Sequence, residues 1–171
     1  DISCEENCAA YTVRAQAIAA GEELCRSYFN MAYETIVLRL DHLYGEPLVA
    51  AEARDICARM SVEGLETGEI RVNPRDRVAL LHYSDAVEFL YAVIMAKKMT
   101  HGVYQISSGE TISVQSAADL VAAELGGVKV VEDTGRERLE PVLSNQRFAE
   151  EFGIRIVHKP ETEIGREAAY I

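Results

Sequence analysis

The sequence predicts an α/β chain, and three observations lead to this fold class. A short run rich in β-branched residues, 36–38, suits a buried parallel strand because it is too short for a helix. A long amphipathic segment, 11–30, precedes it, so the chain opens as helix, turn and strand. Helical and strand-like patterns then alternate over the remaining residues. Such alternation is typical of sheets covered by helices.

Polar residues directly after the first strand are the first candidates for a site. They are Arg39, Asp41, His42 and Tyr44, which precede the break at Gly45. Open α/β sheets bind their ligands at the carboxyl ends of strands. We therefore expect the 34–47 stretch to organise a binding site, with Arg39 in a structural role that pairs at the strand end.

The second part of the chain contains shorter elements separated by turn residues. Ser113 is placed to cap one helix, and Ser84 with Asp85 to cap another, because short polar side chains accept bonds from the first N–H groups of a helix. His82 is assigned to structure as well. The expected elements are helices over 48–63, 86–98, 113–125 and 144–152, strands over 69–73, 78–83, 103–107 and 128–131, and a tail to residue 171.

Composition and charge describe an ordinary globular domain. Of the 171 residues, 49% are hydrophobic and 26% are charged, which is enough apolar surface for a core. The net charge of −11 opposes non-specific binding to nucleic acid. No apolar run approaches the roughly 18 residues of a membrane span, and the first residues are acidic, unlike a signal peptide. We expect a soluble, cytoplasmic protein with no nucleic-acid or membrane partner.

The cysteines and histidines do not form a metal motif. Cys4 and Cys8 are four residues apart, whereas Cys25 and Cys57 are isolated. A zinc site requires further Cys or His ligands at close spacing, and the histidines stand singly in the sequence. We expect reduced thiols that pack as small hydrophobic groups, and no metal site.

Recognisable motifs occur in five segments, 21–28, 38–45, 82–87, 104–113 and 144–153. In this order they resemble the later turns of the catalytic helix, the loop after the next strand, the His-Val-x-Asp-Val segment, the Tyr-Asn-Ile-Gly segment and the Asp-x-Ser-Lys helix of one family. That family is the extended short-chain dehydrogenases, the NAD-dependent nucleotide-sugar epimerases and dehydratases. Each motif alone is weak, but order and intervals agree.

The resemblance implies the C-terminal half of a Rossmann-like fold, a partial parallel sheet plus a small α/β substrate-binding subdomain. Residues 1–47 would be the remnant of the Rossmann-like domain, and residues 48–171 the substrate-binding subdomain. The family's Gly-rich turn, which brings pyrophosphate to a helix N-terminus, has no counterpart in the sequence. We therefore expect this chain alone not to hold the family cofactor NAD(P), and interpret it as a fragment or as a half-protein completed by another polypeptide.

The resemblance leaves the catalytic residues unknown. In the family, a tyrosine and a lysine four residues later act on a sugar hydroxyl, and the cation lowers the pKa of the phenol. Matching residues 21–24 without gaps puts Arg14 at the tyrosine position and Ile18 at the lysine position. Tyr11 is a weak candidate for the acid, because its use requires extra helical residues and places Ala15 at the lysine position. A packing role for Tyr11 is the alternative.

The resemblance also implies three substrate-binding residues. His42 falls where the family has an asparagine that contacts the nucleotide sugar. Arg77 matches, with an offset of one residue, an arginine that contacts the diphosphate, for which a guanidinium fork is suited. Arg136, or alternatively Arg138, corresponds to a second phosphate-contacting arginine. The competing interpretations are a histidine packed at a strand end and arginines that are simply solvated.

We expect the substrate-binding part of a nucleotide-sugar epimerase or dehydratase that is not catalytically competent alone. The implied ligand is a UDP-, GDP- or dTDP-linked sugar, and the parent reaction is a transient hydride transfer through the nicotinamide. The alternative is a non-catalytic pseudoenzyme that acts as a binding or scaffold module, which Ile18 favours. Because a partial sheet leaves one side uncovered, we expect homo-oligomerisation, or pairing with the missing N-terminal half, through residues 11–30 and 36–40.

Overall fold

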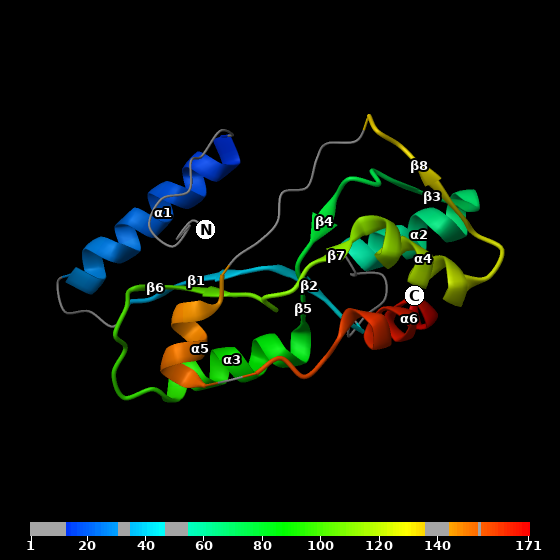
Figure 1. Ribbon diagram of the computed structural model, residues 1–171. Coiled ribbons are helices and arrows are strands. Elements are labelled where there is room, and N and C mark those ends of the chain that lie inside the picture. Colours follow the sequence, from blue (N-terminus) through cyan, green and yellow to red (C-terminus); the bar gives the residue numbers. More distant parts are fainter. Residues whose placement is uncertain (1–12, 31–34, 47–54, 136–143, 154) are drawn as a thin grey trace.

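The computed structural model describes residues 13–30, 35–46, 55–135, 144–153 and 155–171 (Figure 1). No helix in this described part is long and apolar enough to cross a lipid bilayer. The helices are α1 (Val13–Asn30), α2 (Ile56–Thr67), α3 (Tyr83–Met95), α4 (Val114–Leu125), α5 (Gln146–Phe152) and α6 (Pro160–Tyr170). The strands are β1 (Val37–Leu40), β2 (His42–Tyr44), β3 (Glu69–Val72), β4 (Arg77–Val78), β5 (Leu80–His82), β6 (Val103–Ile106), β7 (Ile112–Ser113) and β8 (Lys129–Glu132).

The strands associate in short pairs, most of which are parallel. In the first pair, β1 runs parallel to β6, with Val37 beside Val103 and Leu40 beside Ile106. The pairs β2–β5 and β3–β8 are also parallel, whereas β4 and β7 are antiparallel. The predicted α/β fold with a partial parallel sheet is therefore confirmed.

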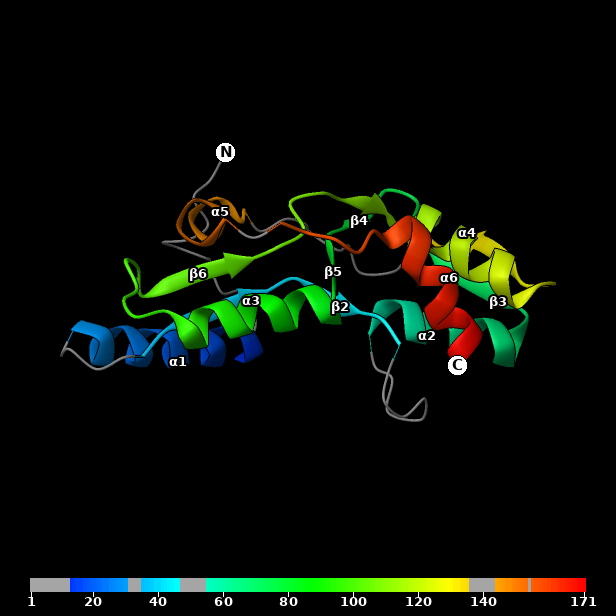
Figure 2. The same cartoon turned by 90° about the horizontal axis from the view of Figure 1, so that it is seen from below.

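Two clusters of buried apolar side chains fill the molecule. The first core gathers residues of β5, β6, α3 and α5, namely Leu81, Ala86, Phe89, Tyr104, Ile106 and Phe148. The second core lies among α2, α4, α6 and β3, where Ile70, Val121 and Ile164 are fully buried. In Figure 2, α3 and α5 lie on opposite sides of β6, while α2, α4 and α6 gather at the other end of the molecule. The chain passes from the first core to the second within β2, between β6 and β7, and between α5 and α6.

The first helix, α1, confirms the long helix expected over 11–30, of which residues 11 and 12 lie outside the described part. An ion pair between Glu22 and Arg39 joins α1 to β1, with 2.8 Å between Arg39 Nε and Glu22 Oε1. A second guanidinium nitrogen contacts the other carboxylate oxygen, and such a fork fixes orientation better than one contact. These bonds from Arg39 lower the pKa of Glu22. The structural role expected for Arg39 is confirmed.

Asp85, in the first turn of α3, holds the segment that leads from α5 to α6. Asp85 is only 3% exposed, and its carboxylate accepts bonds from the backbone N–H groups of Val157, at 3.3 Å, and His158, at 3.0 Å. Nδ1 of His158 lies 3.0 Å from Asp85 Oδ1, and the His158 ring stacks on His82 with 4.3 Å between centroids. These contacts attach the approach to α6 to the first core.

The predicted capping role of Asp85 is wrong, because His82 caps α3 instead. Nδ1 of His82 accepts a hydrogen bond from the Ser84 N–H group at 3.2 Å. The helix therefore begins at Tyr83 rather than at residue 86, and it ends at Met95 because the next residue is extended. An imidazole nitrogen can accept this bond as a short polar side chain does, which leaves the Asp85 carboxylate to bind the distant 157–158 segment.

Other elements also differ from the expectation. The expected C-terminal tail is in fact the helix α6, which has Pro160 at its start and Glu161 in its first turn, both favourable there. The strands β2 and β7 were not predicted, because they are too short to show an alternating pattern. The helix expected over 48–63 is observed from Ile56, where Asp55 caps it, and residues 48–54 lie outside the described part.

Replacing Asp85 with alanine is expected to lower the free energy of unfolding by about 3 kcal/mol, because the N–H groups of Val157 and His158 lose their acceptor. Denaturant unfolding followed by circular dichroism measures this change. Asp119→Ala, on an exposed part of α4, is the matched control and is expected to change stability by less than about 0.5 kcal/mol. Equal stability of the two variants would contradict the role of Asp85.

Candidate functional site

The carboxyl ends of the parallel strands β1 and β6 lie side by side at one edge of this strand pair. The N–H group of Asp41, just after β1, donates to the carbonyl oxygen of Ile106, the last residue of β6, at 3.1 Å. The polar loop 107–111 begins at the same place, where the buried Ser107 accepts a bond from Gly109 N–H at 3.0 Å. The fold thus brings the polar residues after β1 next to a second polar loop, at the edge where open sheets bind ligands.

His42 lies at this edge and is exposed on β2, beside Leu80 of β5. Partial desolvation lowers the pKa of its imidazole, and the positive charge of Arg59 lowers it further. Arg59 projects from α2 and is also exposed. We call these two side chains the His42–Arg59 pair. An anion beside it would be attracted by the guanidinium and would accept a hydrogen bond from the imidazole.

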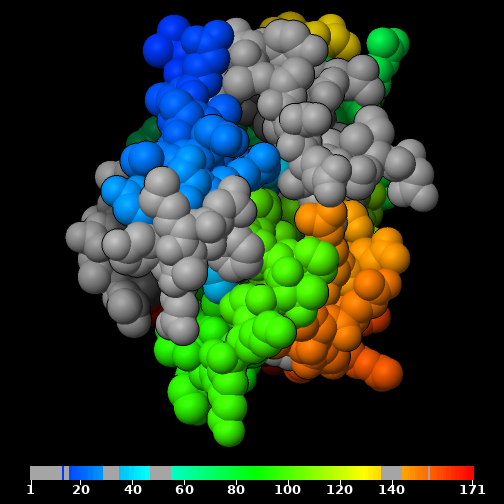
Figure 3. All heavy atoms as spheres, turned by 90° about the vertical axis from the view of Figure 1, so that its left-hand side faces the viewer, coloured from blue at the N-terminus to red at the C-terminus, as the bar shows by residue number. Residues whose placement is uncertain are grey.

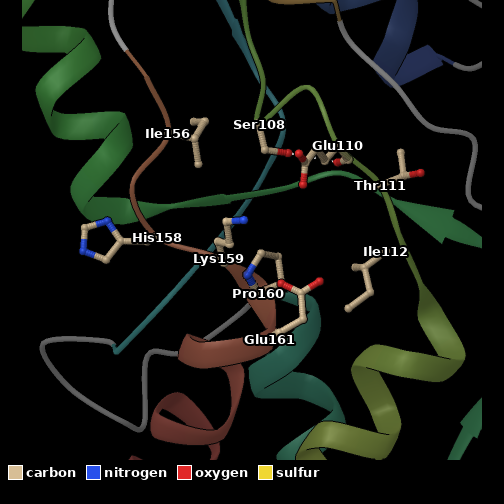
Figure 4. Close-up of a pocket in the computed structure, with 9 residues that line it drawn as sticks. All are labelled: Ser108, Glu110, Thr111, Ile112, Ile156, His158, Lys159, Pro160 and Glu161. Carbon is tan, nitrogen blue, oxygen red and sulfur yellow. Dashed lines mark hydrogen bonds between the residues drawn. The ribbon is translucent and has the colours of Figure 1, made fainter.

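A pocket of about 100 Å³ opens between the loop after β6 and the segment before α6 (Figure 4). It is lined by Ser108, Glu110, Thr111, Ile112, Ile156, His158, Lys159, Pro160 and Glu161. Hydroxyl, carboxylate and ammonium groups therefore converge on one small space, with two isoleucines as its apolar walls. In Figure 4 the Lys159 ammonium points into the space between the two walls. This mixed lining suits a ligand with hydroxyl groups, because it offers both donors and acceptors.

Arg77 is connected to this pocket through Thr111. The Nε atom of Arg77 donates to Thr111 Oγ1 at 2.9 Å, and Nη2 donates to the Thr111 carbonyl at 2.7 Å. One strand segment, 77–82, pairs with β7 at its start and with β2 at its end. The two binding residues predicted from sequence, His42 on β2 and Arg77 on β4, therefore lie in different strand pairs and have different partners.

The remaining predicted positions are of two kinds. Tyr11, Arg136 and Arg138 lie outside the described residues, so their roles stay predictions. Ile18, which the resemblance puts at the lysine position, is 54% exposed on α1. Its side chain has no charge with which to lower the pKa of a phenol.

Sequence reasoning missed Arg59 and His158. In the sequence Arg59 is one charge on a helix, and no local signal distinguishes it, because only the fold places it beside His42. His158 lies in the segment that was expected to be an irregular C-terminal tail. A signal was present there, since a proline followed by acidic residues is a typical helix start and would have located α6.

Four of the helix starts in the described part do not fit a dinucleotide cofactor. The first turns of α2, α3 and α4 are capped by the side chains of Asp55, His82 and Ser113. The first turn of α6 carries Glu161 and Glu163. Pyrophosphate requires N–H groups that are available and not next to carboxylates. The starts of α2, α3, α4 and α6 therefore do not match the pyrophosphate of NAD(P).

One buried group in the described part has the donor types of a metal site. Asp55, Cys57 and Glu167 each place one ligand atom within 4.8 Å of the others, so the fold gives the isolated Cys57 two acidic neighbours. Cys57 is 1% exposed, and desolvation raises the pKa of its thiol well above the ordinary value. At neutral pH a protonated thiol therefore faces the two carboxyl groups, whereas a metal ion binds the thiolate.

The fold is that of the extended short-chain dehydrogenases that act as nucleotide-sugar epimerases and dehydratases, as the five sequence motifs predicted. An epimerase from Methanothermobacter thermautotrophicus matches 96% of this chain with a TM-score of 0.80 and 15% identity, over 51% of its own length. A UDP-galactose 4-epimerase matches 99% of this chain with a TM-score of 0.79 and 18% identity, over 57% of its length.

The dTDP-glucose 4,6-dehydratase of Bacillus anthracis str. Ames, solved in complex with NAD, matches 97% of this chain with a TM-score of 0.77 and 19% identity, over 54% of its length. No family model matches the sequence, and no curated protein matches it. The chain therefore spans about half the length of the structures that it resembles. At these low identities the likeness is one of fold.

Replacing Arg59 with glutamine is expected to raise the pKa of His42, because the substitution removes the positive charge that disfavours the imidazolium. Titration of the His42 imidazole by NMR spectroscopy measures the shift. Desolvation is the larger cause and remains, so the pKa stays below the ordinary value for histidine. The control is Arg75→Gln, which removes an exposed charge in the turn before β4. An unchanged His42 pKa in Arg59→Gln would show that the two side chains are not neighbours.

Proposed function

We propose that this chain is the substrate-binding portion of a nucleotide-sugar epimerase or dehydratase. The His42–Arg59 pair carries the proposal, since it places a cationic side chain and an imidazole at the ligand-binding edge of a protein whose net charge is −11. The net negative charge of the protein does not attract anions over long distances. A local positive site in such a protein therefore favours the binding of a specific anion. The diphosphate of a UDP-, GDP- or dTDP-linked sugar is an anion of this kind.

The pocket supports the sugar part of the proposal. Its hydroxyl and charged groups match the hydroxyl groups of a hexose, and Arg77 holds Thr111 at its rim. Arg77 thus acts on the pocket through Thr111, in addition to the diphosphate contact that the family resemblance implies for it. Names of the similar structures, a UDP-galactose 4-epimerase and a dTDP-glucose 4,6-dehydratase, point to the same ligand class.

Ile18 favours a chain that binds a nucleotide sugar without catalysing a reaction. The residue is exposed where the family lysine would stand, and the starts of α2, α3 and α4 are already capped by side chains. We propose that the chain alone binds but does not transform a nucleotide sugar, with residues 1–47 as the remnant of a Rossmann-like domain and residues 48–171 as the binding subdomain. A pseudoenzyme that serves as a binding or scaffold module is the second candidate.

Exposed apolar side chains support the expectation of a partner. On α3 they are Tyr83, Val87, Leu90, Tyr91, Ile94 and Met95, and on α1 they include Val13, Leu24 and Tyr28. In Figure 3 the blue atoms of α1, and green atoms from the part of the chain that includes α3, both reach the surface on the face shown. We propose that further α/β structure covers these faces, supplied by a second copy or by an N-terminal half.

Addition of UDP-glucose, dTDP-glucose or GDP-mannose is expected to raise the midpoint of thermal unfolding. A ligand at a hundredfold excess over its dissociation constant stabilises the folded state by about 2.7 kcal/mol. His42→Ala and Arg59→Ala are each expected to weaken binding on the order of tenfold, because each removes a hydrogen bond or charge at the diphosphate. Lys98→Ala, an exposed charge beyond α3, is the control. No shift with any of the three ligands, for protein verified as folded, contradicts the proposal.

A further inference from the structure

Glu167 of α6 is a fully buried acid that contacts the chain on both sides of the segment between β2 and α2. Its Oε2 atom accepts a hydrogen bond from Gly45 N–H, directly after β2, at 3.2 Å. Its other side faces Asp55, directly before α2, and the two carboxyl groups are within hydrogen-bonding reach. One side chain therefore ties the end of β2 to the start of α2.

The contact between Glu167 and Asp55 requires a proton. Asp55 Oδ1 accepts from the N–H groups of Cys57 and Ala58, both at 2.9 Å, so this carboxylate is committed to capping α2. Asp55 Oδ2 and Glu167 Oε1 are buried and receive no bond from any N–H or hydroxyl donor. Two ionised carboxylates cannot share such a site, whereas a protonated acid donates one hydrogen bond that satisfies both oxygens.

We propose that Glu167 is a positioning residue that acts in its neutral, protonated form, donating a hydrogen bond to Asp55 and thereby setting the distance between His42 on β2 and Arg59 on α2. This inference rests on the proposed function. His42 stands three residues before Gly45, and Arg59 four residues after Asp55. Because Glu167 holds both Gly45 and Asp55, the geometry of the His42–Arg59 pair depends on it.

The surroundings of Glu167 support the neutral form. Burial, and then the charge of Asp55, raise the pKa of Glu167 to about 9. From α2 it also faces the Cys57 thiol, and from α3 the Tyr83 phenol, whose pKa is raised by burial and by both acids. On α6 itself, Glu163 lies one turn earlier and is paired with Arg166. From α4, the Glu124 carboxylate approaches α6 at Gly165. No positive charge is among the causes that shift the pKa of Glu167.

The sign of the pH effect follows from these values. An acid whose pKa is higher in the folded state binds its proton more tightly there, so its contribution to stability is fully present below the unfolded pKa, near 4.5, and declines until about pH 9. In Glu167→Gln the amide NH₂ group replaces the carboxyl O–H as the donor to Asp55, and the amide oxygen can still accept from Gly45 N–H. The glutamine cannot ionise. The variant therefore preserves the neutral geometry at every pH.

The test compares thermal unfolding of wild type, Glu167→Gln and Glu66→Gln from about pH 5 to about pH 10. Glu66 is an exposed acid on α2 and serves as the control. The midpoint of Glu167→Gln minus that of wild type is expected to grow as pH rises to about 9, whereas the same difference for Glu66→Gln stays flat. A flat difference for Glu167→Gln contradicts the proposal. A second result would also contradict the proposal: added Zn²⁺ raises the unfolding midpoint of wild type but not that of Cys57→Ser. A metal ion, and not a proton, would then join the two carboxyl groups.

Binding of UDP-glucose separates positioning from a purely structural role. One pH unit above the pKa of Glu167 the neutral form is about a tenth of the population, so wild-type affinity is expected to fall about tenfold, and Glu167→Gln to retain its affinity. Titration of the ligand itself affects both proteins equally. Equal losses in both proteins overturn the positioning role. If no protein binds UDP-glucose at any pH, the proposed function and the positioning role fail together, and the unfolding comparison still decides the state of Glu167.

Discussion

The buried carboxylate of Asp85 is the interaction on which the arrangement of the two cores depends. A charge in the interior is tolerated only when hydrogen bonds replace the lost water, and Asp85 receives them from two backbone N–H groups and the His158 ring. All three donors belong to the segment that carries the chain from the first core to α6. Surface ion pairs such as Arg166 with Glu163 contribute about 0–1 kcal/mol at most, so they cannot substitute for this attachment. One wall of the pocket, from Ile156 to Lys159, follows from the same contact.

The electrostatics of the His42–Arg59 pair explain how an acidic protein presents a site to an anion. Arg59 keeps its charge, and together with desolvation it disfavours protonation of His42, so the free protein shows one cation and one neutral imidazole. A diphosphate bound there, as in the proposed function, would reverse this balance, because its negative charge favours the imidazolium. Binding and protonation of His42 would then be coupled. Glu167 contributes by staying neutral, since a second buried charge between β2 and α2 would push these elements apart.

Much of the fold could be predicted from local pattern, and the site only in part. The helix α4 with its cap at Ser113 and the strand β6 follow from capping chemistry and an apolar run, which are local properties. Asp85 was placed as a cap because it stands at a helix start, but its partners lie more than seventy residues away and leave no local trace. Arg59 and Glu167 were missed for the same reason: each acts through a neighbour that only the fold supplies. His42 was predicted because it follows a buried strand, which is a local feature of the sequence, and its binding role stays a prediction.

The most direct test of the account maps ligand-induced changes in amide NMR shifts on isotope-labelled protein as UDP-glucose is added. Perturbed amides are expected to cluster at His42 and the end of β2, at Arg59, and around Thr111 at the pocket rim, while α5 is unaffected. Perturbations that avoid β2 and α2, or none at all at saturating ligand, would contradict the assignment of a nucleotide-sugar site to this edge of the sheet.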